Sequence, residues 1–92
     1  METTYKIASI IAATVGRKLH TYDSWNGSSM TITVEDAEQL TDSVKFTGPN
    51  AWGGKSGIYV HNNCIASLVL TGKAERYSTV DHCDVVERYE LN

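Results

Sequence analysis

The chain has 92 residues, of which 41% are hydrophobic and 21% charged, and a formal net charge of -3. This length predicts one globular domain spanning residues 1–92, and the composition is too apolar and too weakly charged for intrinsic disorder. Free nucleic acid and anionic membranes are disfavoured as partners. Both need clustered Lys and Arg, and only Arg17-Lys18 forms a basic pair.

The first predicted element is a helix from about residue 4 to residue 15. Its apolar stripe is centred on Ile7, Ile11 and Val15, and Ala8, Ile10 and Ala12 broaden it. Gly16 can end the helix in the left-handed conformation, and the basic pair Arg17-Lys18 suits the negative end of the helix dipole. A well-formed helix with one apolar face is therefore expected to pack on the rest of the domain.

The apolar run at residues 7–15 also has to be considered as a targeting segment. It is too short to span a bilayer, and its upstream flank holds Glu2 and a single Lys6 rather than a basic cluster. We therefore expect a cytoplasmic protein in a reducing compartment, in which Cys64 and Cys83 are free thiols.

After the helix the hydrophobic pattern changes to a period of two, which predicts strands. The predicted strands cover residues 18–22, 30–34, 44–47, 58–61, 64–70, 74–80 and 85–91, and residues 35–40 form either a helical turn or a strand extension. Turns are expected at Asn26-Gly27, at Asn62-Asn63, at Thr71-Gly72-Lys73 and at Asp81-His82. The second of these turns would join residues 58–61 and 64–70 into a hairpin.

These elements predict an α+β fold in which one N-terminal helix packs on an antiparallel sheet of roughly five to seven short strands. A curved sheet or a small, partly open barrel is the alternative arrangement. The expected core places Ile7, Ile11 and Val15 against Ile32, Val34, Phe46, Ile65, Leu68 and Leu70.

The segment Gly53-Gly54-Lys55-Ser56 invites comparison with a phosphate-binding loop. That motif needs a glycine five residues before Gly54, where this chain has Pro49, and a helix after it, where Ile58-Tyr59-Val60 favours a strand. Backbone N–H groups together with Lys55 could still hold an anion. Sequestration of a nucleotide-like ligand, with a tryptophan stacked on its base, is therefore the alternative function.

The residue types that bind zinc occur as His61 with Cys64 and as His82 with Cys83. Adjacent residues of a strand point to opposite faces, so the second pair could share a metal ion only in a turn. No nucleophile has a base and an orienting group in a recognisable local pattern. We accordingly predict no metal, no cofactor and no enzymatic activity.

The two tryptophans lie in segments of glycine and small polar residues, at positions 24–29 and 48–57. Tryptophan and tyrosine are enriched in protein–protein hot spots, although a loop tryptophan can also fold back over the core. Connections of this length exceed what a hairpin needs, which is typical of functional loops. The expected partner-binding residues are Tyr22, Asp23, Trp25, Asn26, Glu35, Asp36, Trp52, Lys55 and Tyr59.

These observations lead to the hypothesis of a small, non-enzymatic protein-binding module or inhibitor. A small acidic chain of this kind fits a phage or mobile-element antagonist that occludes a surface of a host defence or nucleic-acid-processing protein. The partner would present a basic surface, and Asp23, Glu35 and Asp36 would steer its approach.

Overall fold

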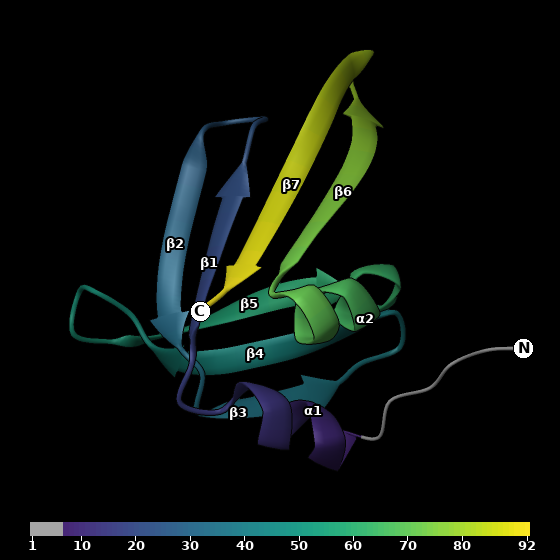
Figure 1. Cartoon of the computed structure of the whole chain (residues 1–92). Helices are drawn as coiled ribbons and strands as arrows, with labels where there is room; N and C mark the ends of the chain where they lie inside the picture. Colours follow the sequence, from purple (N-terminus) through teal and green to yellow (C-terminus); the bar gives the residue numbers. More distant parts are fainter. Residues whose placement is uncertain (1–6) are drawn as a thin grey trace, which may run out of the picture.

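A computed structural model describes residues 7–92, which form two helices and seven strands (Figure 1). In chain order these are α1 (Ile7–Thr14), β1 (Lys18–Asp23), β2 (Ser28–Thr33), β3 (Asp36–Gln39), β4 (Ser43–Pro49), β5 (Lys55–His61), α2 (Asn62–Thr71), β6 (Lys73–Val80) and β7 (Cys83–Leu91). The predicted α+β class is confirmed. Residues 4–6 of the predicted helix lie outside the described residues.

The strands form two antiparallel sheets that do not close into a barrel. One sheet has the order β2-β1-β7-β6, and the other is the simple meander β3-β4-β5. In Figure 1 the four-stranded sheet rises from one side of the three-stranded sheet, with both of its hairpins projecting away from the helices. Helix α2 lies over β4 and β5, and α1 lies beside β3.

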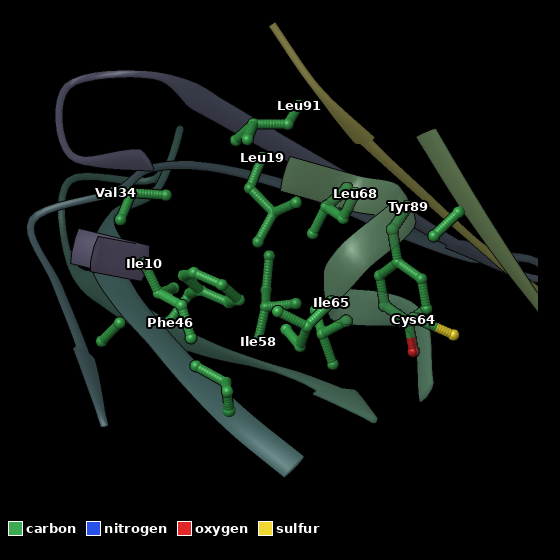
Figure 2. Close-up of a cluster of buried hydrophobic side chains, with 14 of the residues drawn as sticks. Ile10, Leu19, Val34, Phe46, Ile58, Cys64, Ile65, Leu68, Tyr89 and Leu91 are labelled. Atoms are coloured by element: carbon green, nitrogen blue, oxygen red, sulfur yellow. The ribbon is translucent and has the colours of Figure 1, made fainter. Parts of the chain in front are cut away.

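The core fills the angle between the two sheets and the helices (Figure 2). Phe46 and Leu68 are fully buried, and Ile10 and Ile32 are 1% exposed. The expected core residues Ile32, Val34, Phe46, Ile65 and Leu68 are all buried, as predicted. Burial of this kind is the main favourable contribution to folding.

The face of α1 that packs on the core is centred on Ile10, at the margin of the predicted stripe, rather than on Ile7, Ile11 and Val15. Ile10 is buried, Ile7 and Ile11 are only partly buried, and Val15 is 45% exposed. Val15 lies beyond the last helical residue, Thr14, which takes a core position because its hydroxyl donates to the Ile10 carbonyl at 2.7 Å. The buried face of α1 is therefore centred on Ile10 and Thr14, which lie four residues apart on the same side of the helix.

The predicted hairpin at Asn62-Asn63 is wrong, because residues 62–71 form the helix α2. The His61 ring nitrogen Nδ1 accepts from the backbone N–H of Asn63 at 3.2 Å, and Gly72 ends the helix in the left-handed conformation with φ of 79°. The buried residues are Cys64, Ile65 and Leu68, a helical spacing. Leu70, which was expected in the core, is 74% exposed.

The predicted helix stop at Gly16 and two of the predicted turns are confirmed by backbone geometry. Gly16 ends α1 with φ of 87°, and Gly27 has φ of 71° in the turn between β1 and β2. Asp81 and His82 both have positive φ and form a tight turn between β6 and β7. Residues 36–39 of the ambiguous segment are strand β3.

Candidate functional site

Both tryptophans lie at the same position of the same kind of turn. The backbone N–H of Trp25 donates to the Asp23 carboxylate at 2.9 Å, and that of Trp52 donates to the Asn50 side-chain oxygen at 2.8 Å. Each tryptophan therefore occupies the third residue of an Asx turn, in which a side chain replaces a backbone acceptor. The signal for both turns in the sequence is an Asp or Asn two residues before each tryptophan.

Asn50 fixes the whole second turn. Its side-chain oxygen also accepts from the N–H of Gly54 at 3.2 Å, its amide nitrogen donates to the Ser56 hydroxyl at 2.7 Å, and its backbone N–H donates to the Gly54 carbonyl at 2.9 Å. Gly53 has φ of 86°, which suits a residue without a side chain. The result is a closed, hydrogen-bonded loop from which the Trp52 side chain stands 74% exposed.

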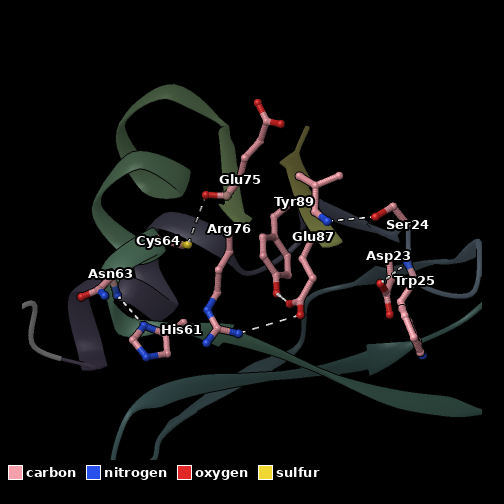
Figure 3. A network of polar contacts seen from close by, with 11 residues as sticks. Asp23, Ser24, Trp25, His61, Asn63, Cys64, Glu75, Arg76, Glu87 and Tyr89 are labelled. Atoms are coloured by element: carbon pink, nitrogen blue, oxygen red, sulfur yellow. Dashed lines mark hydrogen bonds and ion pairs between the residues drawn. The ribbon is translucent and has the colours of Figure 1, made fainter. Parts of the chain in front are cut away.

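The first turn is fixed by bonds to a neighbouring strand. The Ser24 backbone N–H donates to the Val86 carbonyl at 3.0 Å, and the Ser24 hydroxyl accepts from the Val86 N–H at 2.8 Å. The Asn26 side chain accepts from the Ser28 N–H at 3.1 Å. Figure 3 shows the bond from Trp25 to Asp23 and the Ser24 contact. Trp25 is 46% exposed, so just over half of its surface is covered.

The two turns lie at opposite ends of β2. That strand begins at Ser28, directly after the first turn, and Ile32 near its other end forms an isolated bridge with Asn50 of the second turn. In Figure 1 the first turn is the tip of the β1–β2 hairpin, and the second is the loop that extends beside the lower end of β2. The structure does not merge the two turns into one patch within a single chain.

Two other expected binding residues, Tyr22 and Tyr59, meet in a cleft between the two sheets, and Asp23 of the first turn lies at its margin. Tyr22, Asp23 and Tyr59 help to line this cleft, which has a volume of about 280 Å³. Tyr59 is 54% exposed, and the Lys45 ammonium lies 5.7 Å from the centre of its ring, within range of a cation–π contact. The cleft thus adjoins the Trp25 turn through Asp23.

Lys55 and Glu35 form an ion pair with an N–O distance of 2.8 Å. The hydrogen bond to Glu35 and its negative charge raise the pKa of Lys55 above its ordinary value. Both side chains are largely exposed, so the ion pair contributes little to the stability of the fold. The Lys55 ammonium nevertheless has Glu35 as its partner. Asp36 is exposed at the start of the edge strand β3.

A polar cluster, of which Glu87 and Tyr89 line the cleft, was not predicted from the sequence. The Tyr89 phenol donates to the Glu87 carboxylate at 2.6 Å, and Arg76 lies 3.8 Å from the same carboxylate (Figure 3). The pKa of Tyr89 is raised well above its usual range, mainly because the phenol is buried and also because it lies against the Glu87 carboxylate. Every second residue of β7 faces inward, and this alternation was the available signal for Glu87 and Tyr89.

The raised pKa of Tyr89 predicts a loss of stability at high pH. As pH rises above about 10, the unfolded chain loses its phenolic proton while folded Tyr89 keeps it. The stabilisation is therefore complete below that pH and declines above it. Urea unfolding from neutral pH to about pH 11 should show this decline, and Tyr89→Phe should reduce it while costing about 1–2 kcal/mol at neutral pH. Tyr77→Phe, which changes an exposed tyrosine, is the control and should show the same decline in stability as the wild type. An unchanged decline in Tyr89→Phe would refute the assignment.

The four candidate zinc ligands are not brought together. His61 and Cys64 lie at the start of α2, whereas His82 and Cys83 lie at the far turn between β6 and β7. Within residues 7–92, no group of three His, Cys, Asp or Glu side chains is arranged to hold a metal ion. Both cysteines are free, and burial raises the pKa of Cys64, which disfavours its thiolate.

Comparisons of this chain with protein families, with curated proteins and with solved structures find no match. No helix among residues 7–92 is long and apolar enough to cross a membrane.

Proposed function

We propose that this chain is a non-enzymatic protein-binding module whose two tryptophan turns dock on another protein. The observation that carries the proposal is that both tryptophans occupy equivalent positions in hydrogen-bonded Asx turns and remain substantially exposed. An exposed indole on an ordered loop loses little conformational entropy on binding. Tryptophan is also among the residues that contribute most to interface affinity.

A basic partner surface fits the charge of the chain. The net charge is -3, and Asp36 and Glu38 are exposed on the edge strand β3. Charges of this kind accelerate encounter with a basic partner, and salt weakens that effect. The narrower hypothesis, occlusion of a host defence or nucleic-acid-processing protein by a phage or mobile-element antagonist, rests on the small size and acidic character of the chain.

The structure favours this proposal over nucleotide sequestration. In that alternative Lys55 would hold a phosphate, but its ammonium is paired with Glu35 at 2.8 Å. Lys55–His61 also continues as strand β5, so the turn does not lead into a helix whose N-terminus could face the phosphate. We therefore do not propose nucleotide binding.

The proposal predicts a specific pattern of binding losses. A partner captured with the wild-type chain should bind Trp52→Ala or Trp25→Ala at least about 2 kcal/mol, or roughly 30-fold, more weakly. Tyr77→Ala is the matched control, because Tyr77 is also 74% exposed but lies on a strand. Isothermal calorimetry with the purified partner measures all three variants. Full affinity in both tryptophan variants, with a loss in Tyr77→Ala, would place the binding surface on the sheet instead.

A further inference from the structure

The free edge of β2 differs from every other sheet edge in the described part of the chain. The edge strands are β2 and β6 in one sheet and β3 and β5 in the other. Charged residues occur in β3, β5 and β6, whereas β2 reads Ser-Ser-Met-Thr-Ile-Thr and holds none. Proteins commonly protect exposed edges with charges or proline, because unpaired N–H and C=O groups otherwise recruit another strand.

Part of this edge is already closed by the chain itself. Asn50 bridges Ile32, so the second turn covers the end of the strand. Among residues 7–92, no other strand pairs with Ser28–Thr31 on the side away from β1. Ser28 and Ser29 are exposed, and Met30 and Thr31 are partly exposed. The open stretch is therefore short, uncharged and bounded at both ends by a tryptophan turn.

We infer that a second copy of this chain pairs with this edge, joining the two four-stranded sheets through antiparallel β2 strands about a two-fold axis. Such an axis must stand perpendicular to the sheet. Cross-strand neighbours then project from the same face of the sheet, and the residue at the axis pairs with the identical residue of the other copy. The centre falls at Ser29, which is uncharged, because a centre at Met30 would set Ser28 of one copy against Ile32 of the other, whose edge Asn50 already bridges. Self-pairing places any charge near the axis close to an identical charge, which repels it. The uncharged strand β2 is the edge that avoids this repulsion.

The antiparallel arrangement has a consequence for the tryptophans. The first turn precedes Ser28, and the second turn lies beside Ile32, at the other end of the strand. Antiparallel pairing brings the Trp25 turn of one copy beside the Trp52 turn of the other. The dimer thus assembles two composite surfaces from turns that are separate in one chain. This consequence rests on the proposed function, whereas the dimer itself does not.

Introducing a charge at Ser29 tests the inference. Sedimentation equilibrium of the wild-type chain, up to about 1 mM, should show the mass rising from 10.1 kDa toward twice that value. Ser29→Lys and Ser29→Glu should each weaken self-association at least tenfold. An equimolar mixture of the two should restore a dimer, because opposite charges then meet across the axis. Thr79→Lys, an exposed change on β6, should dimerise as the wild type does.

Two results would overturn the inference. One is a wild-type chain that stays monomeric over the whole concentration range. The other is a Ser29→Lys variant that is folded by circular dichroism and dimerises like the wild type. The binding proposal is judged separately, by the affinity of Trp25→Ala and Trp52→Ala for the partner. A monomeric wild-type chain that binds its partner through the tryptophans would contradict the dimer alone.

Discussion

Replacing Gly48 with alanine is expected to destabilise the domain by about 3 kcal/mol or more, and so to lower its melting temperature by roughly 12–24 °C. Gly48 is buried near the end of β4, where the chain leaving β2 crosses it. A methyl group at this position would collide with the backbone carbonyl of Thr33 and press on the backbone nitrogen of Glu35. Backbone atoms cannot rotate away as a side chain can, so the two sheets would have to separate locally.

Gly54→Ala is the matched control for this change. The nearest atom to a methyl group at Gly54 is the side-chain nitrogen of Asn50, at 3.9 Å, which is an ordinary contact. Thermal unfolding followed by circular dichroism should show little change for this variant. A Gly48→Ala variant that melts with the wild type would mean that β2 and β4 do not approach so closely.

The second large effect is expected at Ile10. Truncation of this 1% exposed side chain to alanine should cost ~2–5 kcal/mol, because it leaves a cavity where α1 packs on the core. Ile11→Ala, one residue on, should cost about half of that or less, because Ile11 is only partly buried. Urea unfolding of the two variants measures both free energies.

This pair of variants distinguishes the observed face of α1 from the stripe that periodicity predicted. The stripe through Ile7, Ile11 and Val15 requires Ile11→Ala to be the more damaging change. The structure requires the opposite order. Equal small effects in both variants would show that α1 contributes little to the core.

Most of the strands and turns were predictable because their signals are local. Alternation of Val44 and Phe46 with polar neighbours identified β4, and glycine at positions 16 and 27 identified two chain reversals. The helix α2 was not predictable from its apolar run, because a short, nearly continuous apolar segment fits a buried strand as well as a helix. The His61 cap and the left-handed Gly72 decide in favour of the helix.

The candidate site was predictable only in part. The composition of the two loops singled out Trp25 and Trp52, and both are substantially exposed. The pairing of Lys55 with Glu35 and the gathering of Tyr22 and Tyr59 at one cleft depend on how the two sheets meet. That relation is set by long-range packing, for which a single sequence carries no local signal.

The central claim is that hydrogen-bonded turns hold the tryptophans ordered and exposed, and the fluorescence of Trp52 tests it most directly. The chain has two tryptophans, so Trp25→Phe leaves Trp52 as the only indole. The account predicts the emission of a water-exposed indole whose anisotropy decays only with the tumbling of the whole protein. Adding Asn50→Ala should introduce a fast component, because the bonds that close the turn are lost. A fast component already present with Asn50 intact, or the blue-shifted emission of a buried indole, would contradict the account.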